Sequence, residues 1–240
     1  MIRSRSPEGG PVLLLRGGNL GRCAERLLAE EGVPALVLPV DAPTFSVDGA
    51  AAVLLAADRP YPRVAEAIDD VCWQRGVPWI QAYALAHELV VGPAVIPGRT
   101  PCYACWARRV RSLAPDVAVH DAVTRLASEP GERSWFRGEL AALNEQIAAM
   151  AVAEALSLRA GERRPRARRL GQWWDGNALS DVLRSRQFAR LGRCARCAPG
   201  EQADMTFRAL ADHFRRHPVS PRTPPLTLAE KDSSDEHAAR

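Results

Sequence analysis

Residues 11–31 read PVLLLRGGNLGRCAERLLAEE and give the clearest indication of the fold class. The first residues of this stretch, Pro11–Arg16, form a short apolar run that ends at a glycine-rich turn, and Cys23–Glu31 then follow with helical periodicity. This order predicts a strand, a glycine turn and a helix. Such a unit opens many α/β domains.

Two further apolar runs, Val33–Val40 and Ala50–Ala57, are continuous and lack the alternation of half-buried strands. Continuous runs are typical of parallel strands that helices cover on both faces. Residues Val64–Arg75 then have helical spacing, and Val77–Ala82 begin another strand. The order of elements predicts a doubly wound, mostly parallel, Rossmann-like sheet with right-handed crossovers.

The rest of the chain adds a strand, a long helix and a tail. Glu88–Ile96 read as a strand with a kink at Gly92-Pro93, and Glu139–Arg159 form the clearest helix, which Gly161 ends. We expect this helix to pack on the sheet. The predicted divisions are a flexible N-terminus at 1–10, the α/β domain at 11–199, a short helical extension at 200–217 and a flexible tail at 218–240.

Composition limits the classes of protein to which the chain can belong. Its 240 residues, 47% of them hydrophobic, suffice for one core, and no apolar run approaches the ~20 residues that cross a bilayer. A signal-peptide core is also absent, so we expect a cytoplasmic protein without a membrane partner. The net charge is +4, and every cation except Lys231 is arginine.

An arginine cluster at 163–169 is the densest positive segment of the sequence. Such a cluster could contact phosphate or an acidic peptide, or it could be a solvated loop. Because no aromatic side chains are interleaved with these arginines, we do not expect a nucleic-acid partner.

The six cysteines fall into two classes. Cys23 and Cys72 stand alone in predicted helices and are interpreted as small core residues. The other four form two CxxC pairs in turn-like sequence: Cys102, Cys105, Cys194 and Cys197. Two CxxC turns can complete the tetrahedral Cys₄ shell of a structural Zn²⁺ ion. Two disulfides or two redox pairs are the alternatives, but a reducing cytosol disfavours disulfides and no thioredoxin-type placement is evident.

Two strings around these cysteines carry a family resemblance. GPAVIPGRTPCYACWARR at 92–109 and RCARC at 193–197 resemble ThiF-like proteins that act with YcaO enzymes in the biosynthesis of thiazole/oxazole-modified peptides. The likeness extends over about residues 11–199 and implies a ThiF/MoeB-type fold with the four cysteines as its zinc ligands.

The resemblance also implies a function and partners. In such systems the YcaO enzyme uses ATP to activate a backbone amide, so that Cys, Ser or Thr side chains cyclise into azolines. The ThiF-like subunit binds the precursor peptide and stimulates the YcaO enzyme. Since the first predicted strand begins near Pro11, we expect either that a separate protein supplies the winged-helix element that binds the leader or that this subunit binds the peptide through other surfaces.

Adenylating members of the wider family need a phosphate-binding glycine turn, a ribose-binding acid and an Asp that organises Mg²⁺. Gly17, Gly18 and Gly21 form such a turn with GGxxG spacing, and Asp41 stands where a ribose-binding acid or a solvated loop acid would lie. Asp58 begins the run Asp-Arg-Pro-Tyr-Pro in place of the family's Asp-x-x-Asp-Asn, and the domain has no lysine for the phosphates.

These departures predict a vestigial nucleotide site and a non-catalytic subunit that does not adenylate a substrate, with ATP as a doubtful cofactor. The alternative is an autonomous adenylating enzyme that acts on a peptide or carrier-protein carboxylate. A third hypothesis is a dimerisation scaffold, because members of this family commonly form homodimers. The adjacent Trp173 and Trp174 are candidates for a partner contact or, equally, for the core and edge of one sheet.

Overall fold

The computed structural model describes residues 9–85, 87–129, 140–161, 170–180 and 182–198. These residues all belong to one compact unit, Met1–Glu201. The predictions for residues 1–8, for the arginine cluster at 163–169 and for the extension and tail at 200–240 lie outside the described residues.

The described core is one seven-stranded sheet with the order β2-β1-β3-β4-β5-β6-β7. The strands are β1 (Val12–Arg16), β2 (Ala35–Pro39), β3 (Ala52–Ala57), β4 (Trp79–Leu85), β5 (Glu88–Val95), β6 (Leu170–Asn177) and β7 (Val182–Ala189). Strands β1 to β4 pair in parallel, whereas β5, β6 and β7 add on in antiparallel fashion. The predicted α/β class is confirmed, with a parallel half and an antiparallel half in one mixed sheet.

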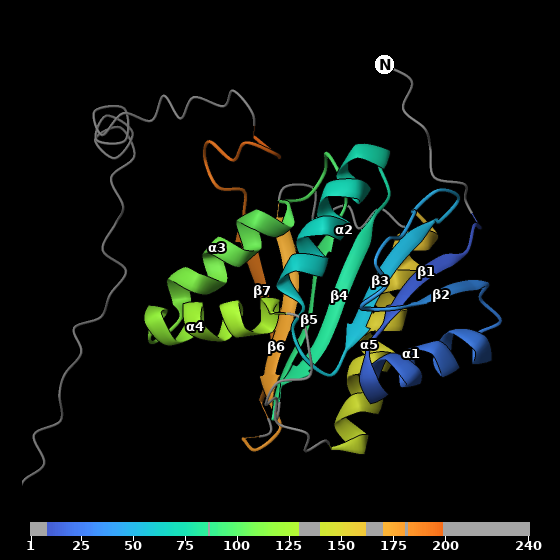
Figure 1. The fold of residues 1–240 in the computed structure, drawn as a ribbon, viewed down its shortest axis with the longest axis horizontal. Coiled ribbons are helices and arrows are strands. Elements are labelled where there is room, and N and C mark those ends of the chain that lie inside the picture. Colours follow the sequence, from blue (N-terminus) through green and yellow to red (C-terminus); the bar gives the residue numbers. More distant parts are fainter. Residues whose placement is uncertain (1–8, 86, 130–139, 162–169, 181, 199–240) are drawn as a thin grey trace, which may run out of the picture. The chain divides into compact units, whose positions relative to one another are not determined.

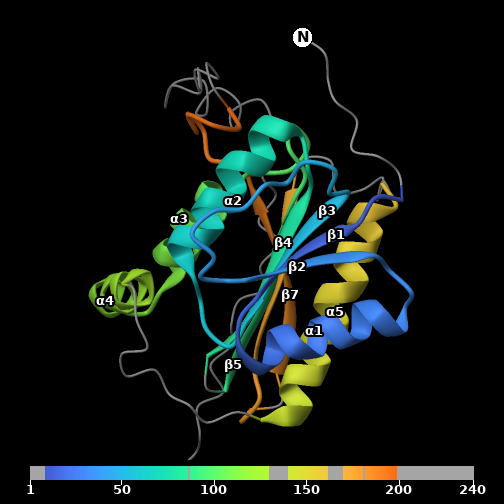
Figure 2. The same cartoon turned by 45° about the vertical axis from the view of Figure 1, so that its right-hand side comes forward.

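Helices cover both faces of this sheet (Figure 1). Their bounds are α1 (Gly18–Glu30), α2 (Pro62–Arg75), α3 (Tyr103–Leu113), α4 (Val117–Ser128) and α5 (Ala141–Arg159). Helices α1 and α5 lie on one face, and α2, α3 and α4 lie on the other, as the turned view makes clear (Figure 2). None of the helices in the described ranges combines the length and the hydropathy that a bilayer crossing requires.

Successive side chains along the central strands point to opposite faces of the sheet, and both faces are buried. In β1, Val12 and Leu14 pack toward α1 and α5, while Leu13 and Leu15 pack toward α2 and α3. All six residues of β3 are buried, which explains its continuous apolar sequence. Helix α5 approaches the sheet closely because small residues such as Ala148 and Ala151, both 0% exposed, line its inner face.

The strand order creates a switch point at the carboxyl end of β1. Strand β1 lies between β2 and β3, so the chain crosses from β1 to one side and later returns to the other. In open α/β sheets, ligands bind at such a switch point, beyond the carboxyl ends of the strands. Arg16 of β1 is in register with Ala56 of β3, so the glycine turn after β1 adjoins Asp58 after β3.

Candidate functional site

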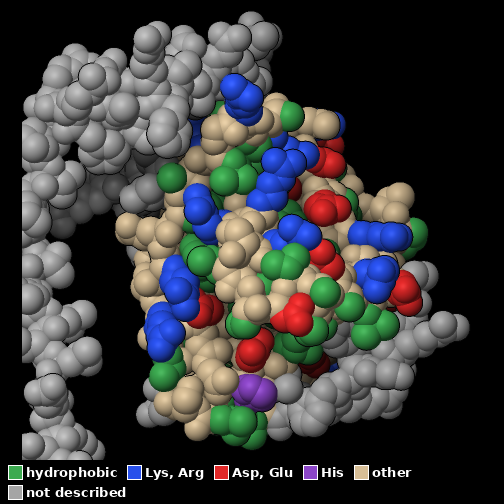
Figure 3. All heavy atoms as spheres, turned by 90° about the vertical axis from the view of Figure 1, so that its left-hand side faces the viewer, with side chains coloured by type: hydrophobic (Ala, Val, Ile, Leu, Met, Phe, Trp, Pro, Cys, Tyr) green, Lys and Arg blue, Asp and Glu red, His purple; other side chains and the backbone are tan. Residues whose placement is uncertain are grey.

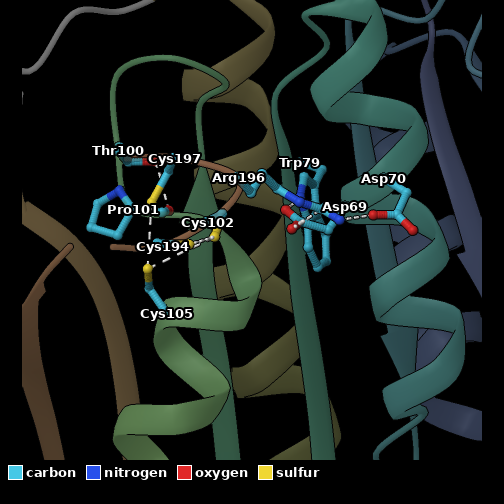
Figure 4. Close-up of polar contacts among 10 residues, drawn as sticks. All are labelled: Asp69, Asp70, Trp79, Thr100, Pro101, Cys102, Cys105, Cys194, Arg196 and Cys197. Atoms are coloured by element: carbon cyan, nitrogen blue, oxygen red, sulfur yellow. Dashed lines mark hydrogen bonds and ion pairs between the residues drawn. The ribbon is translucent and has the colours of Figure 1, made fainter. Parts of the chain in front are cut away.

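The structure brings the four predicted ligand cysteines together from two distant segments. Cys102 immediately precedes α3 and Cys105 lies in its first turn, whereas Cys194 and Cys197 lie in the turns that follow β7. All four side chains are at least 93% buried, and their sulfur atoms lie within 4.8 Å of one another. Figure 4 shows the sulfurs converging on a common centre.

The residues between β5 and α3 have a clear structural role. In the turn Ile96–Thr100, the backbone N–H groups of Arg99 and Thr100 donate to the Ile96 carbonyl oxygen, at 2.9 and 3.0 Å. The Ile96 N–H in turn donates to the Thr100 hydroxyl at 2.8 Å, and Thr100 is buried. This closed turn directs Cys102 toward the second CxxC pair.

The second CxxC pair is shaped by a similar set of backbone bonds. Cys194 N–H donates to the Leu191 carbonyl at 3.2 Å, and Ala198 N–H donates to the Cys194 carbonyl at 3.0 Å. Arg193, just before the pair, has φ of 63° in the left-handed region, which non-glycine residues seldom adopt. Both cysteines of the pair are thereby turned toward the first CxxC segment.

The sulfur spacing fits a tetrahedral metal ion. Three separations are 3.8 Å for Cys102–Cys105, 3.6 Å for Cys102–Cys194 and 3.4 Å for Cys105–Cys197. A tetrahedral zinc–thiolate shell with Zn–S bonds of about 2.3 Å places sulfurs about 3.8 Å apart, whereas a disulfide requires about 2.05 Å. All four cysteines are free thiols, so the cluster could hold a metal ion such as zinc.

The thiols of the cluster are electrostatically unequal. A hydrogen bond from the Cys102 thiol is the main factor that lowers the pKa of Cys105 to about 5, and the Leu191 N–H, 3.4 Å from Cys105 Sγ, acts in the same direction. The Cys102 pKa is raised by that shared proton and by burial, and burial raises the pKa of Cys197 to about 12. Cys105 is therefore the thiol that ionises most readily among the three whose pKa values shift, and it would bind a cation first.

A buried acid, Asp69 on α2, connects both CxxC segments to the parallel half of the sheet. Asp69 is 2% exposed and accepts from Trp79 Nε1 of β4 at 3.0 Å and from Arg196 Nη1 at 2.7 Å. Arg196, which lies between Cys194 and Cys197, also pairs with Asp70 (Figure 4). The backbone N–H of Tyr103, next to Cys102, bonds to Asp69 as well.

Asp69 could not be identified as important from its residue type alone. The signal that sequence analysis missed is its position beside Ile68 on the apolar face of α2, where Ala65 and Cys72 are also buried. A carboxylate on such a face requires a partner, because burying an unpaired charge is strongly unfavourable. Here three donors satisfy it, and two of them come from the segments that hold the cysteines.

At the switch point, the carboxylate of Asp58 occupies the amino end of α1. Asn19 N–H donates to Asp58 Oδ2 and Leu20 N–H to Asp58 Oδ1, each at 2.7 Å. These backbone amides at a helix N-terminus are the groups that would bind a phosphate in a glycine-turn nucleotide site. Gly18 has φ of 61°, and a Cβ there would collide with the Asp58 carboxyl group.

The other predicted residues of the vestigial nucleotide site lie around the same turn. Gly17 caps α1 in extended conformation, and its N–H donates to the Ala56 carbonyl at 2.8 Å. Gly21 packs against the Ala56 carbonyl so closely that a Cβ would lie 2.8 Å from it. Asp41 lies exposed, just after β2. Glycines at 17 and 21 thus serve the packing of α1 on the sheet.

The two adjacent tryptophans lie on opposite faces of β6. Trp173 is 5% exposed and packs edge-on against Phe188, with ring centroids 5.5 Å apart, on the face that α2 and α3 cover. Trp174 is half-buried and packs on the α1 and α5 face. Gly92 makes this packing possible, because a Cβ there would lie 2.8 Å from Trp173 Cβ. The suggested partner contact stays a prediction.

Comparison with known families identifies a match over most of the chain. A profile of the ThiF family matches residues 17–188, which include the glycine turn, Asp58, the first CxxC pair and β6. A search among curated proteins finds no match.

Solved structures share the fold at low sequence identity. A heterocyclase in complex with substrate and cofactor superposes with a TM-score of 0.58 at 18% identity, over 80% of this chain and 26% of that one. The heterocyclase TruD superposes with a TM-score of 0.53 at 20% identity, over 80% of this chain and 28% of that one. MccB of E. coli superposes with a TM-score of 0.55 at 15% identity, over 80% of this chain and 66% of that one. The chain thus spans about a quarter of the length of the two heterocyclases.

Proposed function

Because this chain belongs to the ThiF family, we propose that it is a non-catalytic ThiF-like subunit that binds a precursor peptide and stimulates a YcaO-type, ATP-dependent cyclodehydratase in the biosynthesis of ribosomal peptide natural products. We place this role in the cytoplasm. The four cysteines hold a structural zinc ion, since a closed Cys₄ shell leaves no coordination position for a substrate.

The observation that carries the non-catalytic part of the proposal is the position of Asp58. Its carboxylate takes the Asn19 and Leu20 amides at 2.7 Å, so an internal negative charge stands where a nucleotide phosphate would need positive potential. A second support is the sequence after Asp58, in which Tyr61 and Pro62 stand where adenylating enzymes have the acid and the amide.

The fold comparison supports the peptide part of the proposal. Two of the similar structures are heterocyclases, one of them solved with substrate and cofactor. The alternative function is an autonomous adenylating enzyme that acts on a peptide or carrier-protein carboxylate. The likeness to MccB favours it, because a structure of MccB with ATP superposes on this chain with a TM-score of 0.55. The third hypothesis, homodimer formation, is independent of both proposals and can be tested by light scattering.

The proposal is tested by adding the zinc-loaded protein to a YcaO-type enzyme encoded beside it, with that system's precursor peptide and Mg·ATP. We expect the two proteins to associate and azoline formation, followed by mass spectrometry as loss of water from the peptide, to accelerate about tenfold or more. A tenfold change corresponds to about 1.4 kcal/mol of barrier. Absence of both association and acceleration would refute the proposed function.

The variant Asp58→Asn separates the two functions in the same assay. Asn keeps an oxygen acceptor for one of the two backbone N–H groups that Asp58 binds and turns an NH2 group toward the other, so we expect a loss of about 1–3 kcal/mol in folding stability and unchanged stimulation. In an adenylating enzyme, Asp58 would help to organise Mg²⁺, and the Asn variant would lose most of its activity.

A further inference from the structure

The two segments that carry the cysteines are rich in arginine and contain no acid. Residues 97–113 hold four arginines and residues 187–198 hold three, and neither range has an aspartate or a glutamate. Over the whole chain the two signs nearly balance, with 32 Lys and Arg against 28 Asp and Glu. The excess of positive charge in these segments is therefore local, and the fold brings both of them to the cysteine cluster.

Two of the seven arginines are neutralised by acids from other elements. Arg196 pairs with Asp69 and Asp70 of α2, and Arg111 binds Asp121 of α4 through two bonds of 2.7 and 2.8 Å. Within the described part of the chain, the remaining five have no acidic partner: Arg99, Arg108, Arg109, Arg190 and Arg193. We call these five side chains the basic surface.

Hydrogen bonds between the segments bring the end of β7 to α3 and to the turn before it. Arg190 Nη2 donates to the Gly98 carbonyl oxygen at 3.2 Å, so Arg190 lies next to the turn that carries Arg99. The N–H group of the following residue, Leu191, lies 3.4 Å from the sulfur of Cys105 in the first turn of α3. The arginines of the two segments are therefore neighbours in the fold.

The other three arginines follow the positions of the cysteines. Arg108 and Arg109 come three and four residues after Cys105, so they lie on the side of α3 that meets the end of β7. Arg193 directly precedes Cys194 of the same cluster. The basic surface thus lies around the cysteine cluster, and binding of a metal ion there would hold its parts in place.

The guanidinium groups of this surface are accessible. Arg99, Arg108 and Arg193 are exposed, and Arg109 and Arg190 are half-buried. Figure 3 shows this side of the molecule, on which arginine side chains gather along the left-hand margin. Because the stems of the half-buried arginines are already packed, these side chains lose less conformational entropy when they bind a partner.

The chemistry of the surface limits the class of partner. Guanidinium groups bind carboxylates and phosphates through paired hydrogen bonds. A single-stranded nucleic acid also needs accessible aromatic faces, but Tyr103, Trp106 and Phe188 of these segments are only 4–6% exposed. A second copy would bring the same positive charges to a two-fold contact, where they repel each other. An acidic polypeptide fits the surface best.

We propose that the basic surface binds an acidic segment of another polypeptide. Carboxylates of that segment pair with the guanidinium groups of α3 and of the turns on either side of the cysteine cluster. That this polypeptide is the precursor peptide rests on the proposed function, whereas the requirement for acidic side chains rests on the surface alone.

The test uses the full-length, zinc-loaded protein and a fluorescein-labelled probe peptide, Gly-Glu-Glu-Gly-Glu-Glu-Gly-amide, whose binding is measured by fluorescence anisotropy. We expect saturable binding that weakens severalfold between about 50 and 300 mM salt, because salt screens the attraction between exposed charges. The analogue with glutamine in place of every glutamate carries the same label and should bind about tenfold more weakly or less.

Variants locate the bound probe. The double variant Arg108→Gln with Arg109→Gln should bind it about five- to tenfold more weakly, because two charge-assisted contacts are lost. Arg63→Gln with Arg125→Gln is the matched control. Arg63 and Arg125 are exposed on α2 and α4, outside the two segments, so this variant loses the same net charge and should bind within about twofold of the wild type.

Folding stability distinguishes binding arginines from structural ones. Since Arg108 and Arg109 have no acidic partner in the described ranges, their double variant should retain the metal and unfold at the temperature of the wild type. A marked loss of stability in that variant would overturn the proposal, because the two arginines would then be structural.

The binding assay has its own contradicting outcomes. Absence of saturable binding, equal binding of the glutamine analogue, equal weakening by the control variant, or tighter binding of oligothymidylate, which would reveal a nucleic-acid site, would each overturn the proposal. The assay contains no cyclodehydratase, so its outcome is independent of the stimulation assay.

Discussion

Replacing Cys102 with serine is expected to abolish binding of the proposed zinc ion and thereby to cost on the order of 10 kcal/mol of folding free energy. Cys102 is 0% exposed and its sulfur lies 3.6 Å from Cys194 Sγ, so it joins two segments separated by 92 residues. A loss of this size is comparable to the whole stability of a typical domain. Metal analysis and denaturant unfolding should therefore show a metal-free protein without a cooperative transition.

Two comparisons keep this prediction testable if the variant does not fold. A strong chelator should produce the same loss in the wild type, and added zinc should reverse it. Cys23→Ser is the matched control: Cys23 is half-buried on α1 and lies outside the cluster, so its loss should be below about 1 kcal/mol. A Cys102→Ser protein that keeps its thermal stability without metal would contradict the structural role of the site.

Arg196→Met is expected to destabilise the protein by about 2–4 kcal/mol. Arg196 donates to Asp69 at 2.7 Å, and Asp69 is 2% exposed, so the substitution leaves a buried carboxylate without its cation. Breaking a buried ion pair typically costs about 3–5 kcal/mol, and the remaining bonds from Trp79 and Tyr103 reduce that loss. Denaturant unfolding of zinc-loaded wild type and variant measures the difference.

The deficit of Arg196→Met should depend on pH. Burial raises the pKa of Asp69, while the bonds from Trp79, Arg196 and Tyr103 oppose that shift. Without Arg196 the pKa of folded Asp69 rises further, so the folded variant binds a proton more readily than the unfolded chain does. Its stability therefore recovers as the pH falls through that pKa, and the deficit is largest above it.

A surface ion pair provides the matched control for this prediction. Arg75 and Asp48 lie 2.8 Å apart with side chains 58% and 62% exposed, and Arg75→Met should cost less than about 1 kcal/mol. If Arg196→Met loses no more stability than Arg75→Met, or if its deficit does not change between neutral and mildly acidic pH, the coupling through Asp69 is refuted.

The parallel half of the fold could be predicted because local sequence and tertiary burial agree there. The run Ala52–Ala57 is continuously apolar and is buried along its whole length. The antiparallel strands β6 and β7 were not predicted, because Gly171 and Gly176 interrupt the pattern of β6. Gly171 is explained only by the folded state, in which the Phe188 ring occupies the space that a Cβ would need.

Helices α3 and α4 were also missed. Helix α3, Tyr103–Leu113, begins inside the first CxxC pair, whose flanking sequence is turn-like. Helix α4 buries Ala127 but leaves Val119 58% exposed, so its apolar residues do not mark a core-facing side. Tertiary packing against α2, rather than a clear amphipathic pattern, supports this pair of helices.

The candidate site was predictable to the extent that spacing alone determines it. Two CxxC pairs specify a four-thiol cluster, and the structure brings those residues together. Asp58 was associated with the nucleotide site, but its role as a cap of α1 depends on the pairing of β1 with β3, which no local pattern encodes. The same holds for the Asp69 contacts, whose donors come from segments far apart in sequence.

Calorimetric titration of Mg·ATP into the zinc-loaded protein distinguishes a non-catalytic subunit from an adenylating enzyme. If Asp58 already satisfies the amino end of α1 and the chain acts as a non-catalytic subunit, no saturable heat of binding is expected and no pyrophosphate is released in the presence of peptide. Saturable binding of Mg·ATP, with pyrophosphate release that Asp58→Asn abolishes, would contradict the account and establish an adenylating enzyme.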